Sequence, residues 1–189
     1  MPSRASLKSE LRERMRQWRR QLTSEQQSNT AHTLAEQCVL LPAWAAAKRI
    51  GLYLANDGEV ITDLLAARVR AAGKVPYLPV LEYKQLRFAQ WREGAELVPN
   101  QYGIGEPDET VARRSASELD VLCLPLVAWD RSGTRLGLGA GYYDRTLAQA
   151  PRPLLVGLGH SGREVDELPR DEWDITLDWI VTERDCHRC

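Results

Sequence analysis

The spacing of apolar residues near the beginning of the chain predicts an amphipathic helix. Between residues 3 and 21, apolar side chains recur every three or four positions, and they are Leu7, Leu11, Met15, Trp18 and, just beyond, Leu22. This spacing puts them on one stripe of a helix. The sequence TSEQ at 23–26 has the residues of a capping box, so we expect a second helix from there to about residue 41, ended by Pro42.

Short apolar runs between these and later helices predict the strands of a sheet. Strands are expected at 48–54, 75–78, 86–91, 96–98, 119–129, 152–159 and 177–183, helices at 59–73 and 142–150, and a loop at 100–109. The run LDVLCLPLVAW at 119–129 is almost continuously apolar, which is typical of a strand covered on both faces of a mostly parallel sheet. The alternation of strands and helices predicts an α/β fold.

Length and composition limit the classes of protein to consider. The chain has 189 residues, 43% of them hydrophobic, and a formal net charge of -1, so we expect one domain spanning residues 1–189 and no general attraction to nucleic acid. No apolar stretch approaches the roughly 20 residues of a membrane span, which favours a cytoplasmic protein with no membrane partner. Four scattered cysteines favour reduced thiols over a disulfide framework. We expect a monomer.

The first predicted helix carries a local excess of positive charge. It has seven basic residues and two acidic ones, and the basic residues are Arg4, Lys8, Arg12, Arg14, Arg16, Arg19 and Arg20. Such a face can simply be solvated. A nucleic-acid binder using this helix and Trp18 is a second interpretation, which lacks a basic partner surface or an aromatic-interleaved motif elsewhere.

The sequence RLGLGAGYYDRTL at 135–147 contains more candidate functional residues than any other segment of this length. A strand, a glycine-rich loop and a helix present backbone N–H groups to an anion, usually phosphate. The spacing of GLGAG is not that of the dinucleotide-binding motif, and no G-x-x-x-x-G-K-[ST] motif occurs, so a conventional Rossmann or P-loop enzyme is not expected.

The side chains around these glycines suit a nucleotide. The Arg135 guanidinium can bind phosphate oxygens, and the Asp144 carboxylate can hold Mg²⁺ beside them. Tyr142 and Tyr143 offer flat faces for stacking on an aromatic ligand. A tight turn with buried tyrosine rings is the alternative interpretation.

This segment resembles the signature of the 5-formyltetrahydrofolate cyclo-ligase family. The resemblance rests on Asp130-x-x-Gly133-x-Arg135-Leu136-Gly137-x-Gly139-x-Gly141-Tyr142-Tyr143-Asp144-Arg145-x-Leu147. It extends over nearly the whole chain, through Lys8 and Arg12, YLANDGEV after the first strand, YGIGEP at 102–107 and LPLVAWD before the loop. It implies a three-layer α/β/α fold with a mostly parallel central sheet, Rossmann-like but not of the dinucleotide-binding type.

The resemblance also implies an activity: ATP-dependent conversion of 5-formyltetrahydrofolate to 5,10-methenyltetrahydrofolate, with Mg²⁺ required. ATP would be bound by Lys8, Arg12, Arg135, Gly137, Gly139, Gly141, Tyr142 and Tyr143, with Arg135 and Tyr143 catalytic. The folate pocket is expected at Tyr53, Leu54, Glu59, Leu138 and Tyr142, and the metal at Asp144 and Asp174. Phosphoryl transfer needs mainly positioning and charge stabilisation, which fits a chain with no evident nucleophile.

Several positions depart from the family's pattern. The family usually has a second acid where Ile61 stands, a histidine where Trp173 stands, and a glutamine in the region of Gly162 and Arg163. A non-catalytic nucleotide-binding module that has lost folate turnover is therefore an alternative, with Ile61 as its best support. His160 is interpreted as a polar residue at a strand end, and the CHRC sequence at 186–189, half of a zinc motif, as a frayed tail.

Overall fold

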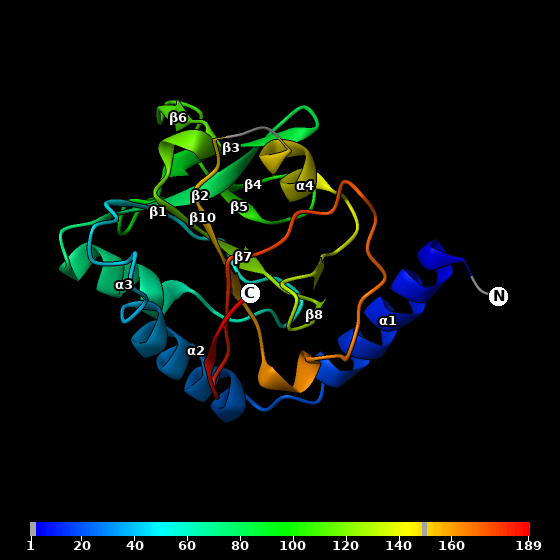
Figure 1. The fold of residues 1–189 in the computed structure, drawn as a ribbon. Helices are drawn as coiled ribbons and strands as arrows, with labels where there is room; N and C mark the ends of the chain where they lie inside the picture. The colour runs from blue at the N-terminus through cyan, green and yellow to red at the C-terminus, as the bar shows by residue number, and fades with distance from the viewer. Residues whose placement is uncertain (1–2, 149–150) are drawn as a thin grey trace.

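The central element of the protein is a twisted sheet of eight strands, shown in Figure 1. The structure is a computed structural model that describes residues 3–148 and 151–189. The strands of this sheet are β1 (Arg49–Gly51), β2 (Val75–Glu82), β3 (Gln85–Gln90), β6 (Arg113–Arg114), β7 (Val121–Pro125), β10 (Leu154–Leu158), β11 (Trp179–Val181) and β12 (Cys186–Arg188). Their order is β12-β11-β10-β7-β1-β2-β3-β6.

The middle of the sheet is parallel and its edges are antiparallel. Strands β11, β10, β7, β1 and β2 pair in parallel, whereas β12, β3 and β6 are antiparallel to their neighbours. The chain adds β2 on one side of β1 and later adds β7 on the other side, so the order reverses between β1 and β7. In an open α/β sheet, ligands bind outside the carboxyl ends of the strands at such a reversal. The mostly parallel α/β fold is confirmed.

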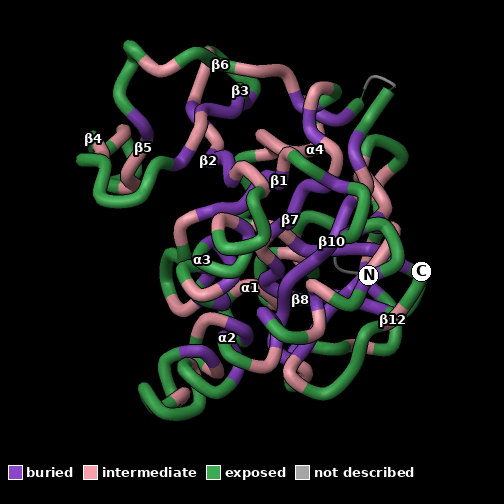
Figure 2. Tube along the Cα trace, turned by 90° about the vertical axis from the view of Figure 1, so that its left-hand side faces the viewer, coloured by how far each residue is buried: buried purple, intermediate pink, exposed green. Residues whose placement is uncertain are grey.

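Helices cover the two faces of this sheet unequally. They are α1 (Arg4–Arg19), α2 (Ser24–Cys38), α3 (Asp63–Ala71) and α4 (Tyr142–Leu147), with 3-10 turns η1 (Ala116–Glu118) and η2 (Ser161–Arg163). Apolar residues of α2 and α3 pack on one face of the sheet, and residues of α4 and η1 pack on the other. Buried chain runs through β7 and β10 in Figure 2. No helix within residues 3–148 and 151–189 is long and apolar enough to cross a membrane.

The predicted starts of the first two helices are confirmed by their caps. Ser3 Oγ accepts a hydrogen bond from the Ser6 amide at the start of α1. At the start of α2, Thr23 and Gln26 form the reciprocal capping box that TSEQ predicts. The helix predicted at 59–73 is shorter, because α3 begins after its N-cap Thr62 and ends before its C-cap Ala72. The helix predicted at 142–150 ends at Leu147, and positions 149–150 lie outside the described residues.

The apolar run 119–129 does not form one strand, so this prediction is wrong. Strand β7 ends at Pro125, which has no N–H to continue the ladder. The chain then leaves the sheet, and β8 (Ala128–Trp129) pairs with β9 (Arg135–Leu136) in a separate hairpin. The loop expected at 100–109 is also partly wrong, because β5 (Gly105–Pro107) lies in it and pairs with β4 (Leu97–Pro99).

The CHRC tail is ordered, which corrects the expectation of a frayed end. Strand β12 pairs along its length with β11, and the Cys189 amide donates to the Asp178 carbonyl. Backbone pairing of this kind needs no hydrophobic pattern, so the sequence carries no signal for it. All four cysteines are free, as predicted. The part of the chain that the structure describes contains no group of three or more His, Cys, Asp or Glu side chains arranged to hold a metal.

A second glycine motif, which the sequence analysis missed, has the dinucleotide-binding spacing. Gly157, Gly159 and Gly162 follow the pattern G-x-G-x-x-G at the end of β10. The segment continues into the three-residue turn η2 and not into a long helix. A Cβ added at Gly162 would lie 2.5 Å from the Trp18 ring, so this glycine makes room for an indole of α1. The motif therefore serves packing between elements.

The carboxylate of Asp130 organises the β8–β9 hairpin. It is buried and accepts hydrogen bonds from the amides of Ser132, Thr134 and Leu168. Asp130→Asn should destabilise the protein by about 2 kcal/mol, because the amide nitrogen faces N–H donors and leaves one unpaired. Urea unfolding measures the change, with the exposed Asp166→Asn as control. Equal unfolding free energies for the two variants would contradict this role.

Candidate functional site

A large cleft opens at the carboxyl ends of β1, β7 and β2, where the strand order reverses. Its volume is about 1200 Å³, which exceeds the usual size of a single small-molecule pocket. Residues that follow β1 and β7 form its floor, α1 forms one wall, and the segment from Arg135 to Asp144 forms another. All fourteen site residues proposed from the sequence line this one cleft.

Three arginines lie against the three glycines of the GLGAG segment. Arg12 Nε donates to the Gly137 carbonyl over 2.9 Å, and Arg145 Nη2 donates to the Ala140 carbonyl over 2.8 Å. Added Cβ atoms would lie 2.9 Å from Arg135 at Gly137, 3.4 Å from Arg12 at Gly139 and 2.7 Å from Arg145 at Gly141. Gly139 and Gly141 also have φ of +107° and +70°, which side chains disfavour. The glycines thus admit three guanidinium groups to one loop.

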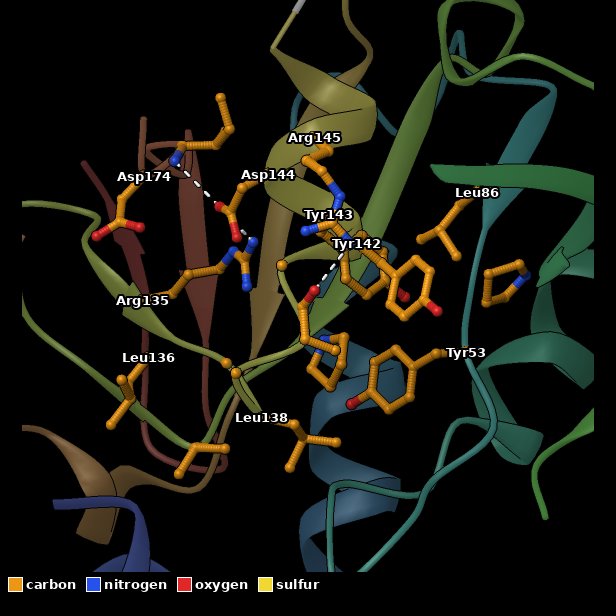
Figure 3. Close-up of a pocket in the computed structure, with 18 of the residues that line it drawn as sticks. Tyr53, Leu86, Arg135, Leu136, Leu138, Tyr142, Tyr143, Asp144, Arg145 and Asp174 are labelled. Atoms are coloured by element: carbon orange, nitrogen blue, oxygen red, sulfur yellow. Dashed lines mark hydrogen bonds and ion pairs between the residues drawn. The ribbon is translucent and has the colours of Figure 1, made fainter. Parts of the chain in front are cut away.

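Arg135 and Asp144 form a partly buried ion pair beside this loop. Arg135 Nη2 donates to Asp144 Oδ1 over 2.8 Å, and the Arg135 side chain is 5% exposed. The same carboxylate oxygen accepts from the Ile175 amide. The Arg135 guanidinium lies 5.6 Å from the Tyr143 ring centre. Figure 3 shows Arg135, Asp144, Tyr143 and Asp174 gathered around the same opening.

The first helix brings a lysine to two carboxylates of the segment that contacts Asp144 through the Ile175 amide. Lys8 Nζ lies 2.6 Å from Asp174 and 2.7 Å from Asp171. Burial lowers the pKa of Lys8, but its hydrogen bonds to these two aspartates outweigh burial and leave the pKa raised. The lysine is therefore cationic at neutral pH, and it ties α1 to the segment around residues 171–174.

The other end of the cleft is aromatic and apolar. Tyr53 and Leu54 follow β1 and line this end. Figure 3 shows Tyr142, Tyr143 and Leu138 of the glycine-rich segment near Tyr53. The Tyr142 ring meets Tyr102 edge to face, with ring centres 6.2 Å apart, and Arg145 lies over its face. Flat rings around an opening suit a planar ligand.

Glu59 is the buried acid at this aromatic end. Its residue is 4% exposed, and its Oε2 accepts from the Asn56 amide over 3.1 Å. Burial raises the pKa of Glu59 to about 7, although the Asn56 amide and the nearby Arg19 and Arg163 lower it. A carboxyl group with this pKa can both accept and donate hydrogen bonds near neutral pH.

Glu59→Gln should change how stability depends on pH. Because the folded-state pKa of Glu59 is raised, the folded protein retains a proton that the unfolded chain has lost, and this group's contribution to stability falls as pH rises from about 4.5 to 7. Glutamine does not titrate, so the variant does not lose this stability. The unfolding free energy of the variant relative to that of the parent should therefore be higher at pH 8 than at pH 5. Urea unfolding at the two pH values tests this. A constant difference between variant and parent would contradict the raised pKa.

Some residues of the cleft were not proposed as site residues from the sequence. They are chiefly Arg16, Tyr102, Arg145, Asp171 and Trp173. Trp173, where the family usually has histidine, is 70% exposed at the cleft mouth, whereas Ile61 is 39% exposed and outside the described lining. The basic face of the first helix is only partly solvated: the Arg16 side chain is 39% exposed and lines the cleft, whereas Arg19 is 2% exposed because it pairs with Asp57. Helical periodicity marks only the apolar stripe and misses such a pairing.

Fold and cleft together define an α/β protein with a segment rich in glycine and arginine beside an aromatic pocket at the switch point of its sheet, an arrangement that suits an anionic ligand next to a planar one. The sequence model of the 5-formyltetrahydrofolate cyclo-ligase family matches residues 4–183 of this chain. The chain is 41% identical to 5-formyltetrahydrofolate cyclo-ligase of Escherichia coli K12 (89% of this chain, 96% of that protein) and 27% identical to that of Mus musculus (94% of each).

The structural neighbours agree with this match. The 5,10-methenyltetrahydrofolate synthetase of Aquifex aeolicus superposes with a TM-score of 0.85 at 35% identity, covering 96% of this chain and 92% of that one. The synthetase of Mycoplasma pneumoniae superposes with a TM-score of 0.75 at 25% identity, covering 93% and 98%. The chain belongs to the 5-formyltetrahydrofolate cyclo-ligase family.

Proposed function

We propose that this protein catalyses the ATP-dependent conversion of 5-formyltetrahydrofolate to 5,10-methenyltetrahydrofolate. The formyl oxygen attacks the γ-phosphoryl group of ATP and ADP leaves. The other folate nitrogen then attacks the activated carbon, loses its proton, and closes the ring as inorganic phosphate departs with the former formyl oxygen. The observation that carries this proposal is that one cleft of a cyclo-ligase family member joins a cationic glycine segment to an aromatic pocket.

The triphosphate is proposed to lie on the glycine segment. Lys8, Arg12 and Arg135 converge there from α1 and β9, and the small glycines leave backbone and guanidinium groups accessible to phosphate oxygens. Phosphoryl transfer is accelerated mainly by such positioning and charge stabilisation. Arg135, next to Tyr143, is proposed to stabilise charge on the transferred group, with Tyr142 and Tyr143 orienting the substrates.

The donor set of the cleft fits Mg²⁺. Mg²⁺ is commonly held by one or two carboxylates together with substrate phosphates and water. Asp144 and Asp174 line the cleft, and the hydrogen bonds of the described residues use Oδ1 of Asp144 and Oδ2 of Asp174, so each carboxylate has a second oxygen. These two residues are proposed to hold the ion. A bound Mg²⁺ would neutralise charge on the phosphate oxygens.

The folate is proposed to lie at the aromatic end. Tyr53, Leu54, Leu138 and Tyr142 supply apolar surface there, and the Glu59 carboxyl group supplies the polar contact for a pterin edge. Because Ile61 lies outside the described lining of the cleft, its replacement of an acid removes nothing from this wall.

Further properties are proposed on the same grounds. A single domain of residues 1–189 is proposed because one family model matches residues 4–183, and the protein is proposed to act as a monomer. Free cysteines, two of them buried, support a reducing compartment such as the cytoplasm. Lys8 and Arg12 are engaged inside the cleft, so the basic helix is assigned to small-molecule phosphate, with no nucleic acid or membrane partner.

A turnover assay tests the proposal. The protein is mixed with 5-formyltetrahydrofolate, ATP and Mg²⁺, and the absorbance of methenyltetrahydrofolate is followed together with phosphate release. One phosphate should appear per product formed, and omission of ATP should abolish both signals. ATP binding without product would favour a non-catalytic nucleotide-binding module, an alternative that the family relatives do not favour.

A further inference from the structure

The acid of the proposed folate pocket is carried by a tight turn with two left-handed residues. In the turn Asn56–Glu59, the Glu59 amide donates to the Asn56 carbonyl over 3.1 Å, and the Glu59 carboxylate accepts from the Asn56 amide. The two central residues, Asp57 and Gly58, have φ of +46° and +75°. Both lie in the left-handed region, as in a type I′ turn, which is uncommon for residues other than glycine and is best tolerated by asparagine and aspartate.

Two buried arginines from distant parts of the chain hold this turn. Arg19, at the end of α1, donates from Nη2 to the Asp57 carboxylate over 2.7 Å. Arg163, in η2, is fully buried and donates from Nη2 to the Gly58 carbonyl over 3.1 Å and from Nη1 to the Leu126 carbonyl over 2.7 Å. One guanidinium thus joins the turn to the end of β7, where the cleft begins.

Trp18 fixes the position of the Arg163 guanidinium. Its ring centre lies 5.5 Å from Arg163 Cζ on one side and 5.7 Å from the His160 ring on another. Gly162 admits the indole, because an added Cβ would lie 2.5 Å from it. The glycine, arginine and tryptophan therefore form one packed unit, and positions 162–163 are one of the three places where the chain departs from the family's pattern.

We infer that Arg163 and Arg19 are positioning residues of the folate subsite, which clamp the turn Asn56–Glu59 and thereby fix the Glu59 carboxylate against the cleft. This inference rests on the proposed function for its substrate. Neither arginine belongs to the described lining of the cleft, so both act through the turn. A guanidinium suits this task because its planar fork reaches two carbonyls that a lysine ammonium cannot bridge in the same way.

Charged groups around Glu59 influence its pKa, so loss of the clamp should change the pH profile of KM for 5-formyltetrahydrofolate. The carboxyl group is faced by Arg19 of α1, Arg163 of η2, Asp57 of the turn, Tyr53 after β1 and Tyr143 of α4, while His160 faces Arg163. Burial lowers the pKa of Arg163 to about 9, so it is cationic at neutral pH and favours ionised Glu59. Removal of this cation should raise the pKa of Glu59.

Arg163→Gln tests the inference, and Arg163→Lys is the variant that retains the charge. The control is Arg131→Gln, at an exposed arginine that pairs with Glu164. Arg163→Gln should raise KM for 5-formyltetrahydrofolate about tenfold, with kcat and KM for ATP within about twofold of the parent, because a displaced carboxylate weakens binding of one substrate. The acid limb of its KM profile should move to higher pH. Arg163→Lys should raise KM but keep the acid limb near the parent's, and the control should match the parent.

A second measurement is independent of turnover. Hydrogen exchange at the Asn56 and Glu59 amides should quicken about tenfold in Arg163→Gln, while amides within α2 exchange at the parent's rate. Unchanged exchange and unchanged KM in this variant would overturn the inference. If Arg163→Gln does not fold, the same two readouts on Arg163→Lys decide, because the lysine also loses the fork. If the parent itself does not turn over 5-formyltetrahydrofolate, the proposed function fails, and the exchange data still accept or reject the clamp.

Discussion

Arg135→Ala should lower kcat/KM for ATP by about 10²- to 10³-fold, the range seen when one preorganised group that stabilises transition-state charge is removed. The Arg135 side chain is 5% exposed, pairs with Asp144 and lies beside Gly137, where phosphate oxygens are proposed to bind. Alanine removes the cation and also frees the Asp144 carboxylate from its partner. KM for 5-formyltetrahydrofolate should change little, because Glu59 and the tyrosines are untouched.

Steady-state kinetics with varied ATP measure this effect. Arg135→Lys is the informative comparison, since it restores charge without the bidentate fork and should recover only part of the loss. Arg152→Ala, at an exposed arginine paired with Asp178, serves as the matched control. Parent-like kcat/KM for ATP in Arg135→Ala would show that the triphosphate is not handled by this segment.

Asp144→Asn should lower kcat at fixed Mg²⁺ by about 10²-fold, and raising Mg²⁺ should restore part of it. The substitution keeps the shape of the side chain but removes the charge that a cation needs. It also weakens the 2.8 Å pair with Arg135, so a part of the loss persists at saturating Mg²⁺. These two contributions separate in a Mg²⁺ titration of kcat.

The exposed Asp166→Asn controls for loss of one negative charge. Its Mg²⁺ dependence should follow the parent's. An Asp144→Asn enzyme with full activity and the parent's Mg²⁺ dependence would remove Asp144 from the metal site and leave Asp174 as the remaining proposed ligand.

The fold could be predicted wherever a local pattern decides the structure. The spacing from Leu7 to Leu22 and the capping box at Thr23 predict α1 and α2, because both signals act within a few residues. The break after Pro125 and the pairing of β12 could not be predicted in the same way, since they depend on which distant backbone groups are available.

The site shows the same division. The glycine segment identifies a phosphate cradle by itself, but Lys8 and Arg12 join it only through the resemblance to the family, because 125 positions separate Arg12 from Gly137. In the sequence, Arg19 is one of several basic residues of the first helix and Arg163 stands at a departure from the family's pattern, and neither observation predicts that the side chain is buried. A charged residue becomes buried when a partner from another segment neutralises it, and that partner is fixed by topology.

Helix α1 touches both ends of the cleft, with Lys8 at the proposed phosphate end and Arg19 at the turn that carries Glu59. Eleven residues separate these side chains, which is about 16 Å along a helix. A helix moves as a rigid unit, so a displacement of α1 at Lys8 also displaces it at Arg19. The free-energy effects of substituting Lys8 and Arg163 should therefore not be additive. The double substitution should have a smaller effect than the sum of the two single substitutions.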